Sequence, residues 1–204
     1  RILPVCIYYA EMVLSADAEF SDEEAIESIH TVAALTHNHL RSHIACGLYY
    51  FMVKELMKAG AETAASDAND CKNLKKKELN EILQSGLDAG FAFYEKFCKD
   101  DSWGLEQLDY YNRCRNLQDF AKTEVQEIRS SGYVLHTFEA VVWCLINTAD
   151  FRECLLKAVN LGDDTDTVAA IAGGLAGIFY GYGGIPAEWL DVIVKREWIE
   201  ELCQ

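Results

Sequence analysis

Three carboxylates and two hydroxyl groups fall within five consecutive residues, Asp163–Thr167, of this 204-residue chain. Asp164, Asp166 and Thr167 have the spacing Asp-x-Asp-Thr, and alternate residues of an extended turn point the same way. Hard divalent cations prefer oxygen ligands of this kind. Two carboxylates this close repel each other unless a cation lies between them. The motif therefore predicts a divalent-cation site, although a helix N-cap made of the same residue types is an equal alternative.

A run of small and aliphatic residues follows the motif at 168–177 and predicts a buried helix. Gly173, Gly174 and Gly177 lie inside this run, although glycine in a helix interior costs roughly 1 kcal/mol relative to alanine. These glycines indicate that a neighbouring helix or a ligand approaches the helix backbone, and close helix packing alone is the competing explanation. An EF-hand is excluded, because Ala and Gly occupy the positions where a bidentate Glu would be needed.

Helical spacing of apolar residues is common in the rest of the chain, and strand-type alternation is hard to find. The two prolines, Pro4 and Pro186, lie near opposite ends, so the chain between them can be helical. Ser21 and Glu24 have the spacing of a capping box, which predicts a helix start. The predicted helices cover about 4–14, 22–35, 40–57, 75–84, 86–98, 104–114, 117–127, 136–147, 150–159, 167–180 and a last segment from 186.

Short polar turns separate several of these helices and would have to position the acidic motif. Each is flanked by two helices, so the three could converge on one pocket of a single all-α domain. A longer polar stretch at 60–77 predicts a mobile surface loop. The three short turns are predicted at 36–39, 130–133 and 160–167.

Composition restricts the classes of partner. The formal net charge is −15 and the pI is about 4.7. The single short basic run, Lys72–Lys77, is typical of a solvated helix end or loop. Nucleic acid is therefore not expected as a structural partner. No apolar run approaches the roughly 18 residues of a membrane span, so no membrane partner is expected. Eight scattered cysteines without a CxxC pair favour reduced thiols and a cytoplasmic location.

The motif at 162–167, followed by Ala-Ala-x-Ala-Gly-Gly-x-Ala-Gly-x-x-Tyr-Gly, resembles the ADP-ribosylglycohydrolase family, and most of all its bacterial members that act on dinitrogenase reductase. Other segments resemble the family as well, from one end of the chain to the other. Ser131–Ala140 is similar to its Gly-Tyr-Val segment, and Ala158–Gly162 to the residues that lead into its metal motif. Ala34–His37 is similar to its Leu-Thr-His turn. Arg1–Val5 is similar to the residues after its Asn-Gly-x-x-Met-Arg segment.

This resemblance implies a compact, orthogonal multi-helix domain with a binuclear Mg²⁺ site, sometimes occupied by Mn²⁺. It implies that Asp164, Asp166 and Thr167 are metal ligands. It also assigns His37 to the substrate pocket, and the alternative is a histidine that only caps a turn. It assigns Tyr133 to the same pocket, with packing in the core as an equal alternative. The remaining substrate-binding candidates are Gly132, Gly162 and Asp163, the last of which replaces a glycine common in the family.

The family's Gly-Asp-x-x-Gly and Thr-Asp-Asp-Thr segments, which supply its other metal ligands, have no counterpart in these residues. The resemblance therefore implies that residues 1–204 correspond to the C-terminal two-thirds of a family domain. We expect such a chain to bind Mg²⁺ poorly and to be inactive unless the N-terminal segment is supplied. The carboxylate that acts as general acid or base is expected before Arg1, so the sequence names no catalytic residue.

The implied activity is hydrolysis of the bond between ADP-ribose and a modified protein, with an arginine linkage as the first expectation. Serine-linked, nucleic-acid-linked and free ADP-ribosyl substrates remain open. A non-catalytic member that binds ADP-ribose or has a structural role is the main alternative, and a plain helical interaction domain is a third. The sequence does not indicate the oligomeric state.

Overall fold

The computed structural model describes residues 2–15, 20–64 and 73–203, and these residues form helices joined by turns, with no strand among them. The predicted all-α class is therefore confirmed. The helices are α1 (Leu3–Leu14), α2 (Asp22–Ala34), α3 (Leu40–Ala64), α4 (Asn73–Phe97), α5 (Ser102–Asp109), α6 (Leu117–Phe120), α7 (Val134–Ile146), α8 (Phe151–Val159), α9 (Thr165–Tyr180), α10 (Ala187–Leu190) and α11 (Arg196–Leu202), with 3₁₀ turns η1 (Asn112–Cys114), η2 (Val125–Glu127) and η3 (Tyr182–Gly184).

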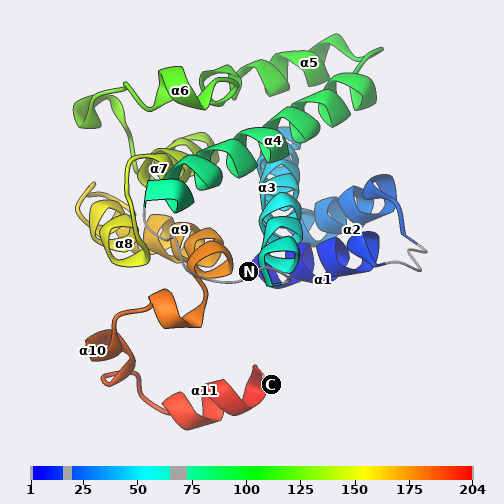
Figure 1. The fold of residues 1–204 in the computed structure, drawn as a ribbon. Coiled ribbons are helices and arrows are strands. Elements are labelled where there is room, and N and C mark those ends of the chain that lie inside the picture. Colours follow the sequence, from blue (N-terminus) through cyan, green and yellow to red (C-terminus); the bar gives the residue numbers. More distant parts are fainter. Residues whose placement is uncertain (1, 16–19, 65–72, 204) are drawn as a thin grey trace.

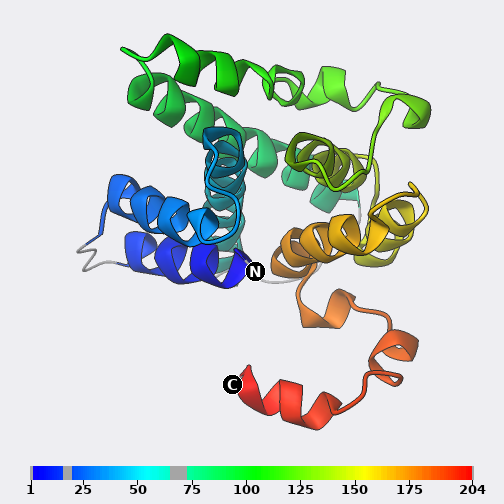
Figure 2. The ribbon, with the colours of Figure 1, turned by 180° about the vertical axis from the view of Figure 1, so that it is seen from behind.

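Helix α3 stands at the centre of the fold, and helices from both halves of the chain pack around it. Helices α1 and α2 lie side by side against one flank, α4 crosses α3, and α7 and α9 lie on the opposite flank (Figures 1 and 2). Leu48, Met52 and Val53 in the middle of α3 are completely buried, as expected for the stretch 44–53, which has no charged residue on any side. The C-terminal segment with α10 and α11 extends away from this body (Figure 1).

Side-chain caps start several of the helices. The Ser21 hydroxyl accepts a hydrogen bond from the Glu24 amide at 3.3 Å, and the Ser21 amide donates to the Glu24 carboxylate at 2.8 Å, so the predicted capping box is confirmed. Asp150 caps α8 by accepting from the Glu153 amide at 2.8 Å. Such caps satisfy amides that have no partner within their own helix.

The break predicted near Gly86 is wrong, because α4 continues through it from Asn73 to Phe97. A Cβ added at Gly86 would lie 2.8 Å from Met52 Cα and 2.8 Å from the Phe51 carbonyl oxygen. Glycine at this position therefore lets the backbones of α4 and α3 approach each other, instead of ending a helix.

Other predicted boundaries also move. Helix α3 runs to Ala64 instead of ending near 57, so the polar stretch predicted as a loop at 60–77 is helical at both ends, while 65–72 lie outside the described residues. The helices predicted at 104–114 and 117–127 are shorter, with 3₁₀ turns in place of their last turns. The last predicted helix is divided into α10 and α11.

Five buried cysteines are free thiols: Cys6, Cys98, Cys114, Cys144 and Cys154. Burial raises the pKa of the Cys154 thiol to about 11, so it remains protonated and unreactive near neutral pH. This arrangement matches the expectation of reduced thiols. Across the described segments, no helix has both the length and the apolar character needed to cross a bilayer.

A stacked pair of histidines joins α2 to α3. The centres of the His30 and His43 rings lie 4.8 Å apart, and His30 Nε2 lies 2.7 Å from the Tyr94 hydroxyl. Both histidines line a small surface pocket, to which Glu23 and Glu27 also contribute. Burial, followed by the neighbouring His43, lowers the pKa of His30 to about 4. Burial, followed by His39, lowers the pKa of His43 as well.

This pair predicts a specific loss of stability in acid. Because the folded-state pKa of His30 lies below its unfolded value of about 6.5, neutral His30 stabilises the fold above that pH, and the contribution is lost as pH falls toward 4. Between pH 7 and 4.5, the free energy of unfolding should fall by on the order of 2 kcal/mol more in the wild type than in His30→Gln. Urea unfolding at both pH values measures this, and equal losses in the two proteins would contradict it.

Candidate functional site

Hydrogen bonds join two of the predicted polar turns. The Asp164 amide donates to the Ser130 carbonyl at 3.0 Å, and the buried Ser130 hydroxyl donates to the Gly162 carbonyl at 2.8 Å. These bonds hold the starts of α7 and α9 together. Helix α3 packs against both of these helices and begins directly after the third turn. The fold therefore brings residues of all three turns to the same cavity.

The backbone of the acidic motif makes a sharp turn before α9. Gly162 has a φ of +92° and Asp163 a φ of +52°, both in the left-handed region. This turn places Asp164 at the N-cap of α9, yet its carboxylate caps no backbone amide. Asp164 Oδ1 instead accepts a hydrogen bond of 2.8 Å from the Thr167 hydroxyl. This arrangement argues against the N-cap interpretation of the Asp164 side chain.

Glycine allows the two turns to touch at the Asp164 carboxylate. A Cβ added at Gly132 would lie 3.1 Å from Asp164 Oδ2, so a larger residue would press on the carboxylate. On α9, a Cβ added at Gly174 would lie 2.6 Å from Leu3 Cδ2 and 2.9 Å from the Tyr49 hydroxyl oxygen. Close packing of α9 against α1 and α3 therefore accounts for at least this member of the small-residue run.

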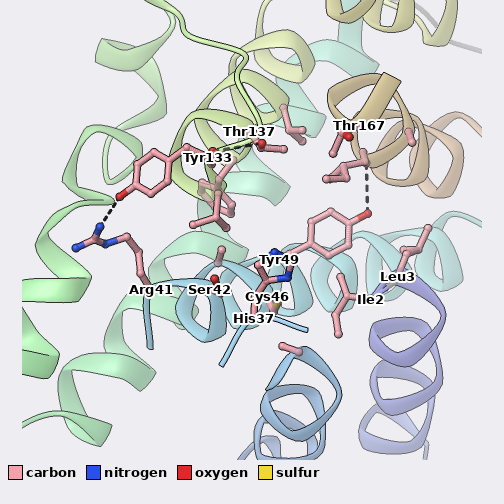
Figure 3. Close-up of a pocket in the computed structure, with 18 of the residues that line it drawn as sticks. Ile2, Leu3, His37, Arg41, Ser42, Cys46, Tyr49, Tyr133, Thr137 and Thr167 are labelled. Carbon is pink, nitrogen blue, oxygen red and sulfur yellow. Dashed lines mark hydrogen bonds between the residues drawn. The ribbon is translucent and has the colours of Figure 1, made fainter. Parts of the chain in front are cut away.

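A cavity of about 660 Å³ opens where these elements meet. Figure 3 shows its walls, to which α1, α3, α7 and α9 all contribute. Buried Tyr49 forms part of the wall and donates its hydroxyl to the Ile171 carbonyl of α9 at 3.3 Å, and burial raises the pKa of this phenol. A mostly apolar cavity of this size with a few converging polar groups is typical of a small-molecule site.

The structure brings together some of the predicted site residues and not others. Four of the predicted residues line the cavity: His37, Gly132, Tyr133 and Thr167. Asp164 lies directly behind Gly132 and beside Thr167. Three other residues of the acidic motif are exposed and do not line the cavity: Gly162, Asp163 and Asp166. Tyr133 is 38% exposed, so the alternative that it packs in the core is wrong.

His37 has two features that bear on its role. It lines the cavity, and its Nδ1 lies 2.9 Å from the Thr36 hydroxyl within the same turn. The actual start of α3 is capped by a different histidine, since His39 Nδ1 accepts from the Arg41 amide at 3.1 Å. His37 is therefore positioned by its turn without serving as the cap of the helix.

The fit of this chain to a divalent cation is partial. Asp164 Oδ1 and Thr167 Oγ1 lie 2.8 Å apart at the edge of the cavity, and both are oxygens of the kind that Mg²⁺ prefers. Among the described residues, however, no group of three or more His, Cys, Asp or Glu side chains could hold a metal ion. These two residues would offer a cation oxygen ligands from one side, and they do not by themselves complete a coordination shell.

Arg41 and Tyr49 are among the residues of the cavity wall that sequence reasoning missed. Arg41 lies in the first turn of α3, four residues after His37, in a helix that is otherwise mostly apolar. A cation at the start of such a helix, next to a candidate pocket turn, was the available signal. Tyr49 carried none, because a tyrosine within an apolar helix reads as core.

Comparison with known proteins agrees with this arrangement. A sequence model of the ADP-ribosylglycohydrolase family matches residues 1–204. An ADP-ribosylarginine hydrolase, Tri1 of Serratia proteamaculans, is 47% identical over 89 residues, which are 44% of this chain and 24% of that protein. The ADP-ribosyl-[dinitrogen reductase] glycohydrolase of Rhodospirillum rubrum is 43% identical over 72 residues, 34% of this chain and 24% of that protein. The human ADP-ribosylhydrolase ARH3 is 29% identical over 119 residues, 50% of this chain and 33% of that protein.

An all-α fold with one cavity at the meeting of three polar turns thus coincides with a family match along the whole chain. The chain belongs to the ADP-ribosylglycohydrolase family. The stretches that align with the Serratia and Rhodospirillum relatives each span about a quarter of those proteins (24%).

Proposed function

We propose that the protein carrying this chain is a hydrolase that releases ADP-ribose from modified arginine side chains. The observation that carries the proposal is the cavity into which the 36–39 and 130–133 turns and Thr167 converge. Its volume of about 660 Å³ lies in the range of small-molecule sites. The arginine linkage is supported by the 47% identity to an ADP-ribosylarginine hydrolase. A cytoplasmic location, in keeping with the free thiols, is part of the proposal.

In this proposal the residues of the chain mainly bind and orient the substrate. Tyr133 offers a partly exposed ring, and His37 a polar ring, at the cavity wall. Gly132 lines the cavity and leaves room for the Asp164 carboxylate beside it. Holding the scissile bond in one geometry is itself a large part of catalysis. The general acid or base is not assigned to any residue of this chain.

We further propose that Asp164, Asp166 and Thr167 hold Mg²⁺ from one side of a binuclear site, with Mn²⁺ as a substitute. When bound, such ions would orient ribose hydroxyls and stabilise developing negative charge. The adjacent oxygens of Asp164 and Thr167 support this ligand set. Because the described residues form no complete metal cluster, the remaining ligands would come from the N-terminal segment that the family resemblance implies. The 204-residue chain alone would then be inactive.

The proposal is tested by measuring ADP-ribose released from an ADP-ribosylarginine protein by the full-length protein with Mg²⁺. We expect turnover that EDTA abolishes and that added Mg²⁺ or Mn²⁺ restores. A serine-linked substrate run in parallel tests the linkage. Release from the serine-linked substrate alone would overturn the arginine assignment, and no release from either would overturn the hydrolase proposal.

A second candidate is a non-catalytic protein that binds ADP-ribose. The incomplete metal cluster in the described residues favours it. Calorimetric titration of the full-length protein separates the two: tight ADP-ribose binding without Mg²⁺ dependence and without turnover supports the binder. Binding that requires Mg²⁺ and is followed by hydrolysis supports the enzyme.

A further inference from the structure

The guanidinium group of Arg41 joins three elements at one end of the cavity. Its Nη1 donates to the Tyr133 hydroxyl at the start of α7, and its Nη2 donates to Gln107 Oε1 on α5 at 2.6 Å. The face of the guanidinium lies 3.8 Å from the centre of the Tyr110 ring. Gln107 is buried, so this end of the group is fixed within the protein. Arg41 is therefore held on two sides while it holds Tyr133.

Tyr133 connects this network to the cavity wall, to which Arg41 also contributes. It is the N-cap residue of α7, it lines the cavity, and 38% of its surface is exposed. Apart from its contact with Arg41, its ring packs edge-to-face on His136, with centroids 5.0 Å apart. Figure 3 shows the Arg41 and Tyr133 side chains meeting at one end of the cavity, with the bond between them drawn. Without the guanidinium, the phenol would lose the contact that anchors its outer end.

We propose that Arg41 is a positioning residue that fixes the Tyr133 ring as a rigid wall of the ADP-ribose site. The inference rests on the proposed function, since it assigns the cavity to that ligand. An arginine suits the task because its planar fork can donate two bonds and stack on an aromatic ring at once, which a lysine cannot do. A ring already held in its bound orientation avoids the entropic cost of being ordered by the ligand.

The charge of Arg41 gives a competing explanation that can be separated from positioning. Tyr133 and Gln107 both accept through neutral oxygens, so the guanidinium keeps its positive charge beside the cavity of a chain with a net charge of −15. That charge would attract a diphosphate whether or not Tyr133 is held. Arg41→Lys keeps the charge and loses the fork, whereas Tyr133→Phe keeps both the charge and the ring and loses only the anchored hydroxyl.

The test is calorimetric titration of full-length variants with ADP-ribose in the presence of Mg²⁺. We expect Arg41→Met, Arg41→Lys and Tyr133→Phe each to bind about tenfold more weakly, and the double variant Arg41→Met/Tyr133→Phe to bind no more weakly than Arg41→Met. The control is Arg115→Met, which removes a guanidinium lying 4.1 Å from the centre of the Phe91 ring, outside the cavity. It should leave the affinity unchanged, and melting temperatures identify any variant that fails to fold.

Each outcome decides a separate claim. Arg41→Met with wild-type affinity overturns the positioning role and leaves the proposed function standing. Arg41→Lys with wild-type affinity shows that charge alone matters and also overturns it. If the wild type does not bind ADP-ribose, the proposed function fails, and NMR of ring-labelled tyrosine decides the positioning role without any ligand. The Tyr133 signal, assigned by its loss in Tyr133→Phe, should shift toward that of free tyrosine in Arg41→Met, and an unchanged signal overturns the inference.

Discussion

Asp164→Ala should lower the release of ADP-ribose from ADP-ribosylarginine by at least about 100-fold, with the fold retained. Losing a residue that only supports a metal ligand costs 10- to 100-fold, so losing a proposed ligand should cost at least the upper figure. The carboxylate caps no backbone amide, and its one described bond is to the Thr167 hydroxyl, so its removal should change stability little. Initial rates at saturating Mg²⁺, together with thermal melting, measure both effects.

Asp150→Ala is the matched control, because Asp150 is also an N-cap aspartate and does cap its helix. It should cost about 1 kcal/mol of stability and leave turnover unchanged. Asp166→Ala should behave like Asp164→Ala, although Asp166 is exposed in the first turn of α9. Turnover like that of the wild type in Asp164→Ala would remove Asp164 from the ligand set.

The parts of the fold that follow from local chemistry were predictable. The Ser21 capping box needs only a hydroxyl and a carboxylate three residues apart, and it forms as expected. The turns predicted at 36–39, 130–133 and 160–167 contain residues that compete with helical hydrogen bonding. Each lies between two helices in the structure, although α9 already begins at Thr165, within the third predicted turn. Their convergence follows from the packing of α3 against α7 and α9, which the sequence could only suggest.

Gly86 shows why other boundaries were missed. A glycine within a helical pattern permits either a break or a close approach of another backbone, and the two are alike in the sequence. Contact with Met52, 34 residues earlier by numbering, decides the matter in favour of close approach. A local pattern contains no information about which distant backbone passes nearby.

The same limit applies to the candidate site. Asp164 and Thr167 form a local pair, three residues apart, so the motif alone predicted their proximity. Arg41 binds Gln107 and Tyr133, which lie 66 and 92 residues away, and no spacing rule connects residues so far apart. Residues that act through tertiary contacts become visible only when the helices are placed in space.

Arg113→Met should lower the free energy of unfolding at pH 7 by about 2–3 kcal/mol. Arg113 Nη1 binds Glu139 Oε2 at 2.6 Å, and Glu139 is only 4% exposed in the middle of α7. Burial raises the pKa of Glu139, and Arg113 opposes this rise. Removing the cation leaves a buried carboxylate that must stay charged without a partner or take up a proton.

The effect should depend on Glu139 and on pH. In the Glu139→Gln background, Arg113→Met should cost little, because no buried charge is left unpaired. Since the folded-state pKa of Glu139 is raised, protonation relieves the penalty, and the deficit of Arg113→Met should shrink between pH 7 and pH 5. Urea unfolding of the four proteins at both pH values measures this. An equal deficit in both backgrounds would show that Arg113 stabilises the fold through its contact with the Phe120 ring, 5.4 Å away, and not through the carboxylate of α7.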